Sequence, residues 1–106
     1  MTRTVGKTPY KKENFTKCAE LFKVMSNAKR LEIMNIIKDK EVTVNEISEI
    51  LGARKSNTSQ HLSYLRYTGI VTARRSGKNI FYKLTDPRIV EACKTLSEVK
   101  INNLLV

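Results

Sequence analysis

One polar stretch, from Arg54 to Arg66, holds the side chains best suited to contact a ligand. On a helix, Thr58, Leu62 and Leu65 recur four and three positions apart and predict a narrow buried stripe. A merely solvated helix usually carries Glu and Lys pairs on its other face, whereas compact amides and hydroxyls suit the edges of bases in a DNA groove. The outward residues here are Lys55, Ser56, Asn57, Ser59, Gln60 and Ser63. We expect base-edge contacts from Asn57, Ser59, Gln60 and Ser63.

Positive charge gathers around this stretch. The 106 residues include 20 Lys and Arg against 10 Asp and Glu, a formal net charge of +10. Between residues 52 and 88 a single acid, Asp86, stands against Arg54, Lys55, Arg66, Arg74, Arg75, Lys78, Lys83 and Arg88. Such a segment is typical of a surface that lies on phosphates. We expect phosphate contacts from Arg54, Arg66, Arg74, Arg75 and Lys78, with Lys55 and Ser56 on sugar and phosphate at the start of the helix.

The elements that position these residues follow from apolar periodicity and from turn residues. Thr43 and Glu46 have the spacing of a capping box, and Gly52 suits a left-handed helix end. A helix, a tight glycine turn and a second helix form the arrangement in which the second helix enters the major groove. The expected elements are helices over 12–25, 28–38, 44–51 and about 55–68, strands over 70–75 and 80–84, and a last helix reaching residue 101.

Two β-rich runs after Gly69 predict a hairpin with a four-residue loop, Ser76 to Asn79. Because the basic residues Arg74, Arg75 and Lys78 crowd its tip, we interpret the hairpin as a wing that reaches phosphates or the minor groove. Asp86 and Pro87 then predict the cap and the first residue of the last helix. In the third helix we expect Ile47, Ile50 and Leu51 to point inward, and in the second we interpret Arg30 and Glu32 as solvated surface.

The first and last helices have more apolar surface than one small domain can cover, so we expect a symmetric homodimer joined through them. A dimer doubles the recognition helices and predicts two half-sites roughly 34–36 Å apart, hence a palindromic double-stranded DNA operator. The expected organisation is a flexible basic arm over residues 1–11, followed by a DNA-binding and dimerisation domain over 12–106.

Several function classes are not expected. No apolar run is long enough to span a bilayer and no secretory signal is present, so we expect a cytoplasmic protein without a membrane partner. The single histidine, His61, has no nearby carboxylate to orient it for nucleophilic catalysis. Gly77 and Lys78 lack the other glycines of a phosphate-binding loop. We therefore expect neither an enzyme nor a cofactor.

Four phrases, in this order, resemble the ArsR/SmtB family of winged-helix repressors. They are LFKVMSNAKRLEI at 21–33, SQHLSYLR at 59–66, GIV at 69–71 and GKNIFYKL at 77–84. The resemblance implies a mainly helical winged helix-turn-helix with a β-hairpin wing, homodimeric through its first and last helices, that binds an operator under the control of an inducer. Neither metal site standard in the family is present, because residues 41–46 contain no cysteine and no histidine follows Asp86. The inducer is unknown.

Two cysteines, Cys18 and Cys93, occupy the two helices assigned to the dimer. The family fold packs these helices together, which implies that the thiols can approach within a subunit or across the dimer. Oxidation or persulfidation would then alter the spacing of the recognition helices. Two alternatives are a soft metal or metalloid held by these thiols, and plain packing of two small apolar side chains.

Two other classes of function remain open. A low-specificity architectural protein of the chromatin type needs only the +10 charge. A winged helix that docks a protein partner would use the same polar helix face for a different purpose. The ratio of specific to bulk DNA affinity separates the first class from a regulator, and salt dependence separates the second.

Overall fold

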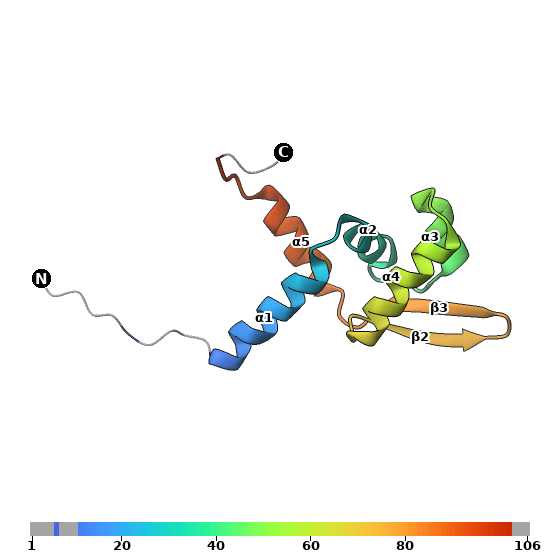
Figure 1. The fold of residues 1–106 in the computed structure, drawn as a ribbon, viewed down its shortest axis with the longest axis horizontal. Coiled ribbons are helices and arrows are strands. Elements are labelled where there is room, and N and C mark those ends of the chain that lie inside the picture. The colour runs from blue at the N-terminus through green and yellow to red at the C-terminus, as the bar shows by residue number, and fades with distance from the viewer. Residues whose placement is uncertain (1–5, 7–10, 103–106) are drawn as a thin grey trace, which may run out of the picture.

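The computed structural model describes residue 6 and residues 11–102. Its elements are α1 (Lys12–Met25), α2 (Ala28–Ile37), β1 (Val42–Thr43), α3 (Val44–Leu51), α4 (Lys55–Tyr67), β2 (Val71–Ser76), β3 (Asn79–Leu84) and α5 (Arg88–Glu98) (Figure 1). The mainly helical fold with a β-hairpin that the sequence predicted is confirmed. Most of the predicted arm over residues 1–11 and the apolar end at 104–106 lie outside the described residues.

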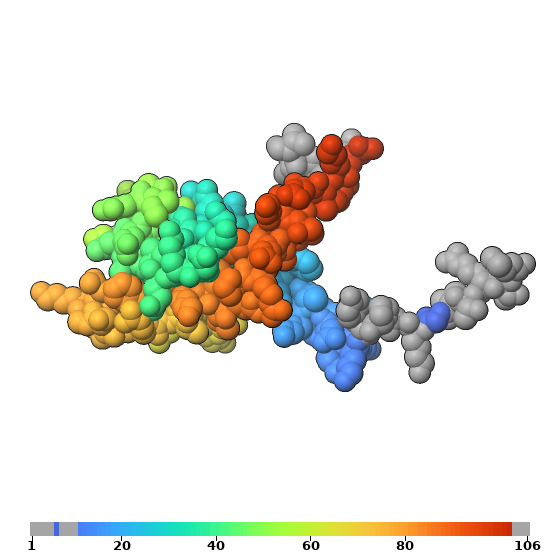
Figure 2. Space-filling model, turned by 180° about the vertical axis from the view of Figure 1, so that it is seen from behind, coloured from blue at the N-terminus to red at the C-terminus, as the bar shows by residue number. Residues whose placement is uncertain are grey.

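The core lies between α2, α3, α4 and the sheet. Ile33 and Ile37 of α2, Ile47 of α3, and Leu62 and Leu65 of α4 are fully buried. Together with the buried Thr58, the α4 residues form the stripe expected from their spacing. α1 and α5 extend away from this body in different directions, as Figures 1 and 2 show from opposite sides. Helix α4 is therefore held in place by its packing against α2, α3 and the sheet.

Helix α3 begins and ends as the sequence predicted. The Glu46 N–H donates to the Thr43 hydroxyl (3.3 Å), and the Thr43 N–H donates to the Glu46 carboxylate (3.0 Å), which completes the capping box. The bonds that the Thr43 N–H and hydroxyl donate to the carboxylate lower the pKa of Glu46 below its usual value. Gly52 ends the helix with φ at +65°, a left-handed conformation that glycine adopts without strain.

The sheet is larger than predicted and its hairpin is tighter. β1, which the sequence analysis did not predict, pairs antiparallel with β3, and the strand order is β1-β3-β2. The expected four-residue loop is wrong: Ser76 and Asn79 are paired across the strands, which leaves a two-residue loop of Gly77 and Lys78. Gly77 has φ at +61°, and this conformation lets two residues join the strands.

Three further expectations need correction. α5 ends at Glu98 rather than at Ile101, because Val99 and Ile101 have little of this chain to pack against and stay 49% and 59% exposed. Pro87, expected as the first residue of the helix, is instead its N-cap, and α5 begins at Arg88. The Asp86 carboxylate, expected as the cap, accepts the Arg88 N–H at 3.0 Å from one position earlier.

Ile50 does not point inward but is 63% exposed. Successive helical residues are rotated by about 100°, so the face that contains Ile47 and Leu51 also contains Ser48 and turns Ile50 outward. Among the described residues, no helix is long and apolar enough to cross a membrane.

Candidate nucleic-acid interface

Helix α4 presents a polar face opposite its buried stripe. Ser56, Asn57, Gln60 and Ser63 are exposed, whereas Ser59 is half-buried. At about 100° of rotation per residue, Gln60, Ser56 and Ser63 lie nearest the middle of the outer face, and Asn57 and Ser59 lie on its two flanks. From the sequence we expected base-edge contacts from Asn57, Ser59, Gln60 and Ser63 alike, and a sugar or phosphate contact from Ser56. Of the four residues expected at base edges, Gln60 and Ser63 therefore point most directly away from the buried stripe.

Two tyrosines on the same helix were not among the predicted contact residues. Tyr67 is 89% exposed and Tyr64 37% exposed. Asn57, Gln60, Tyr64 and Tyr67 are three or four positions apart, so all four lie on one side of α4. That spacing was available in the sequence, but the expected contact face ended at Ser63.

The two ends of α4 carry positive charge. Arg54 caps the helix without a side-chain hydrogen bond, and no acid lies in the first turn. Lys55 follows Arg54 and is exposed, as is Arg66 in the last turn. Because a helix N-terminus already attracts anions, the start of α4 suits a phosphate group.

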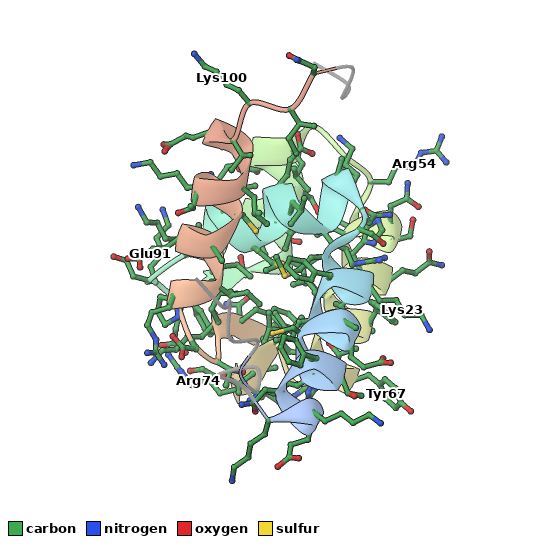
Figure 3. The ribbon with its side chains drawn as sticks, turned by 90° about the vertical axis from the view of Figure 1, so that its left-hand side faces the viewer. Lys23, Arg54, Tyr67, Arg74, Glu91 and Lys100 are labelled. Atoms are coloured by element: carbon green, nitrogen blue, oxygen red, sulfur yellow. The ribbon has the colours of Figure 1, made fainter. Side chains whose placement is uncertain are left out.

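The two wing arginines lie on opposite faces of the sheet. Arg74 pairs across the strands with Phe81, and Arg75 with Ile80. Because side chains alternate along a strand, Arg75 shares the face of Ala73, which packs against the core, and Arg74 points to the outer face. In Figure 3, Arg74 lies on the opposite side of the molecule from Arg54 and Tyr67.

Arg74 also has a partner of its own. Its Nε and Nη2 donate to the Glu41 carboxylate at 2.7 and 3.1 Å, and its guanidinium lies 4.8 Å from the centre of the Phe81 ring. The hydrogen bond with Arg74 lowers the pKa of Glu41, and the same bond raises the pKa of Arg74. Of the two wing arginines, Arg75 is therefore the better placed for DNA, together with the exposed loop residue Lys78.

The cysteines do not share a site within one chain. Cys18 is exposed on α1, and Cys93 is half-buried on α5; both are free thiols. Burial raises the pKa of the Cys93 thiol. Cys93 lines a cavity of about 550 Å³ between α2 and α5, to which Leu31 and Met34 also contribute and Cys18 does not. The described residues contain no cluster of three His, Cys, Asp or Glu side chains that could hold a metal ion.

Arg30 is not the solvated residue that the sequence analysis described. It is half-buried, and its Nε donates to the Val24 carbonyl at 2.7 Å. Its guanidinium lies 4.6 Å from the centre of the Tyr64 ring in α4. Glu32, the expected surface partner, pairs instead with Lys29 at 3.3 Å. No sequence signal links residues 30 and 64, so this contact requires the tertiary structure.

Helices α3 and α4, the turn at Gly52 and the charged β2–β3 hairpin define a winged helix-turn-helix protein. A model of the bacterial regulatory protein arsR family matches residues 27–73. The transcriptional activator HlyU of Vibrio cholerae is 36% identical over 77 residues, which cover 73% of this chain and 71% of HlyU. The chain therefore belongs to the ArsR family, as the resemblance implied, and is a DNA-binding transcriptional regulator rather than an enzyme.

Two further comparisons extend this likeness. A biofilm growth-associated repressor of Xylella fastidiosa is 35% identical over 78 residues, 74% of this chain and 68% of the repressor. The structure of reduced HlyU from Vibrio cholerae superposes with a TM-score of 0.72 at 34% identity, over 79% of this chain and 88% of that one. One of these relatives is named an activator and the other a repressor.

Proposed function

We propose that this protein is a homodimeric repressor that recognises a palindromic operator in a sequence-specific manner. The observation that supports it best is the exposed face of α4, which contains no acidic residue. It has uncharged amides and hydroxyls at its centre and basic side chains at its ends. Dimerisation is supported by the apolar residues that α1 and α5 leave exposed, among them Phe22, Leu96 and Ile101.

Base edges would be contacted from the middle of α4 and phosphates from around it. We assign base-edge contacts to Gln60 and Ser63, with Asn57 and Ser59 at the flanks of the groove. Tyr67 is added as a residue that reaches the DNA backbone beyond Ser63. The phosphate contacts are assigned to Arg54, Lys55, Ser56, Arg66, Arg75 and Lys78, with Arg74 a weaker contributor because Glu41 already holds it.

Two substitutions test this division of labour. Gln60→Ala should relax sequence preference at one operator position by about 1–3 kcal/mol, because a base-edge contact is lost. Arg75→Ala should weaken operator and random DNA alike and reduce the salt slope by about one, because a phosphate contact is lost. Titration of labelled duplexes by fluorescence anisotropy at several salt concentrations measures both effects.

The same titrations decide between the competing functions. A site selected from random sequence should bind at least about 10³-fold more tightly than bulk DNA. A ratio near one would contradict the proposal and favour an architectural protein. DNA binding that is absent, or indifferent to salt, would favour a protein-docking role. Equal losses on both duplexes for Gln60→Ala would show that Gln60 does not contact a base edge.

Repression is tested separately in cells. A reporter placed behind the selected operator should increase its expression when the gene for this regulator is deleted. A decrease on deletion would identify an activator instead.

We also propose that thiol chemistry controls DNA binding. Cys18 is the more accessible thiol, whereas the raised pKa of Cys93 leaves less of its reactive thiolate at neutral pH. Both thiols are free in the single chain, so a covalent link between them is sought first across the two subunits of the proposed dimer. A non-reducing gel and a DNA-binding assay, with and without oxidant, on wild type, Cys18→Ser and Cys93→Ser should show an oxidised species with altered affinity that one substitution abolishes.

The remaining inducer hypotheses give different results in that assay. A soft metal or metalloid held by the cysteines would change DNA affinity under reducing conditions, and either substitution would remove the response. Unchanged DNA affinity under oxidant, metal and metalloid alike would indicate that both cysteines only pack.

A further inference from the structure

Arg30 connects three helices that the sequence separates widely. Its side chain donates to the carbonyl of Val24 in the last turn of α1 (2.7 Å), and its guanidinium carbon lies 4.6 Å from the ring centre of Tyr64 in α4. Its own backbone N–H is fixed, because it donates to the capping side chain of Asn27 at the start of α2 (3.0 Å). One side chain therefore bridges the junction of α1 and α2 to the DNA-facing helix.

Each contact made by Arg30 has a clear physical basis. Val24 is buried, and carbonyls in the last turn of a helix have no partner within it, so a charged donor there satisfies an otherwise orphaned group. A cation also suits the negative end of the α1 dipole. A guanidinium over a tyrosine ring is attracted by the face of the ring, and this contact depends on orientation.

The contact with Tyr64 bears on how α4 is oriented. Tyr64 lies one helical turn beyond Gln60 and on the same side of α4 as Asn57. The buried side of α4 consists of Thr58, Leu62 and Leu65, whose apolar packing is not directional. A directional contact from Arg30 is suited to fix the rotation of the helix about its own axis.

We propose that Arg30 is a positioning residue for operator recognition, fixing the rotation of α4 relative to the end of α1 through Tyr64. This inference rests on the proposed sequence-specific function. It assigns a specificity role to a residue of α2 outside the DNA-facing helix and the wing. It also gives a physical connection by which a movement of α1 would reach the base-contacting face.

The test compares operator and random DNA affinities of the full-length protein. The variants are Arg30→Lys, Arg30→Gln, Tyr64→Phe, Tyr64→Leu, the double variant Arg30→Gln/Tyr64→Leu, and Lys29→Gln as a matched surface control. Lys29 is the neighbouring cation, and its ion pair with Glu32 is exposed. A partly unfolded variant loses apparent affinity equally for both duplexes, so the operator-to-random ratio isolates specificity from stability. Thermal unfolding of each variant is followed in parallel.

We expect Arg30→Gln and Tyr64→Leu each to lower the operator-to-random ratio about tenfold. Arg30→Lys should lower it similarly, because an ammonium lacks the planar fork that donates to Val24 and stacks on the ring. Tyr64→Phe, which keeps the ring, and Lys29→Gln should remain within about twofold of wild type. The double variant should be no worse than either single variant, since both remove the same contact.

Several results would overturn the proposal. If Arg30→Lys kept full operator discrimination, the positive charge alone would account for the role of residue 30. If Arg30→Gln lost affinity equally for both duplexes and had a smaller salt slope, Arg30 would be an ordinary phosphate contact. Losses in the ratio that simply add in the double variant would show that the residues act independently. A wild-type ratio near 10³ that neither substitution alters would reject only the role of Arg30, whereas a wild-type ratio near one would reject the sequence-specific function itself.

Discussion

Ser48 is a buried polar residue on the inner face of α3. It is 6% exposed, and within the described part of the chain its hydroxyl oxygen has no hydrogen-bond partner. A buried, unsatisfied polar group costs roughly 1–3 kcal/mol, and alanine favours a helix more than serine does. Ser48→Ala should therefore raise the free energy of unfolding by about 1 kcal/mol, measured by urea denaturation. Ser63→Ala, on an exposed helix face, should change it by less, and a loss of stability in Ser48→Ala would reveal a partner for the hydroxyl.

Asp86 makes stability depend on acid pH. Hydrogen bonds from the Arg88 side chain and backbone lower its pKa from 3.8 to about 2. A carboxyl with a lower pKa in the folded state stabilises the fold above its ordinary pKa, and that contribution is lost as pH falls through the folded value. The melting temperature of wild type should therefore fall more than that of Asp86→Asn between about pH 4 and pH 2. Parallel curves for the two proteins would contradict this assignment.

At the level of single residues, the sequence identified the polar face of α4 but not the difference between Arg74 and Arg75. That difference depends on the face of the sheet each arginine occupies and on Glu41, which lies 33 positions from Arg74 in the sequence and accepts its hydrogen bonds. Local spacing predicts which residues share a helix face, whereas the face of a strand depends on its partner strand.

At the level of elements, the turn after α2 contains a strained residue. Lys38 has φ at +44° and ψ at −102°, and it is the single non-glycine residue with positive φ in the part of the chain described. Lys38→Gly should raise the free energy of unfolding by about 1 kcal/mol, because glycine adopts this conformation without strain. Chemical denaturation tests the change. Lys40→Gly, in the same turn but without positive φ, should be neutral or destabilising, and equal gains in both variants would exclude strain as the cause.

Elements with strong local signals were predicted well and the others were not. The capping box of Thr43 and Glu46 and the glycine at position 52 fixed the bounds of α3 correctly. β1 contains two residues, which is too short for any periodic pattern, so it became visible only through its pairing with β3. Hydrophobicity alone favoured burial of Ile50, but the packing of α3 against its neighbours buries Ser48 instead and leaves Ile50 exposed.

At the level of the whole molecule, the exposed apolar residues of α5 predict the effect of a charge at the proposed dimer interface. Leu96 is 52% exposed in the single chain. Leu96→Glu should weaken the homodimer about 100-fold or more, because each copy loses roughly 1.5–3 kcal/mol of apolar burial. Sedimentation equilibrium measures the dimer and anisotropy the loss of operator binding. Lys94→Glu, a larger charge change on the other side of α5, is the control, and equal effects would place the interface elsewhere.

The overall architecture was predictable because each helix carries its own apolar pattern and the four resembling phrases lie in family order. Contacts between elements that are distant in the sequence were not predictable. Arg30 and Tyr64 are both polar residues on helix surfaces, and nothing local distinguishes them from solvated neighbours. Such contacts arise when α1, α2 and α4 converge, so they appear only in the assembled fold.

Thr43 belongs to two structures at once. It pairs with Phe81 of β3 as the last residue of β1, and it caps α3 as the residue before its first turn. Thr43 thereby connects the wing directly to the helix pair α3–α4, so neither can shift without straining the other. The hairpin and the helix pair should therefore keep the same relative placement in the free and the DNA-bound protein, so that binding costs little conformational entropy.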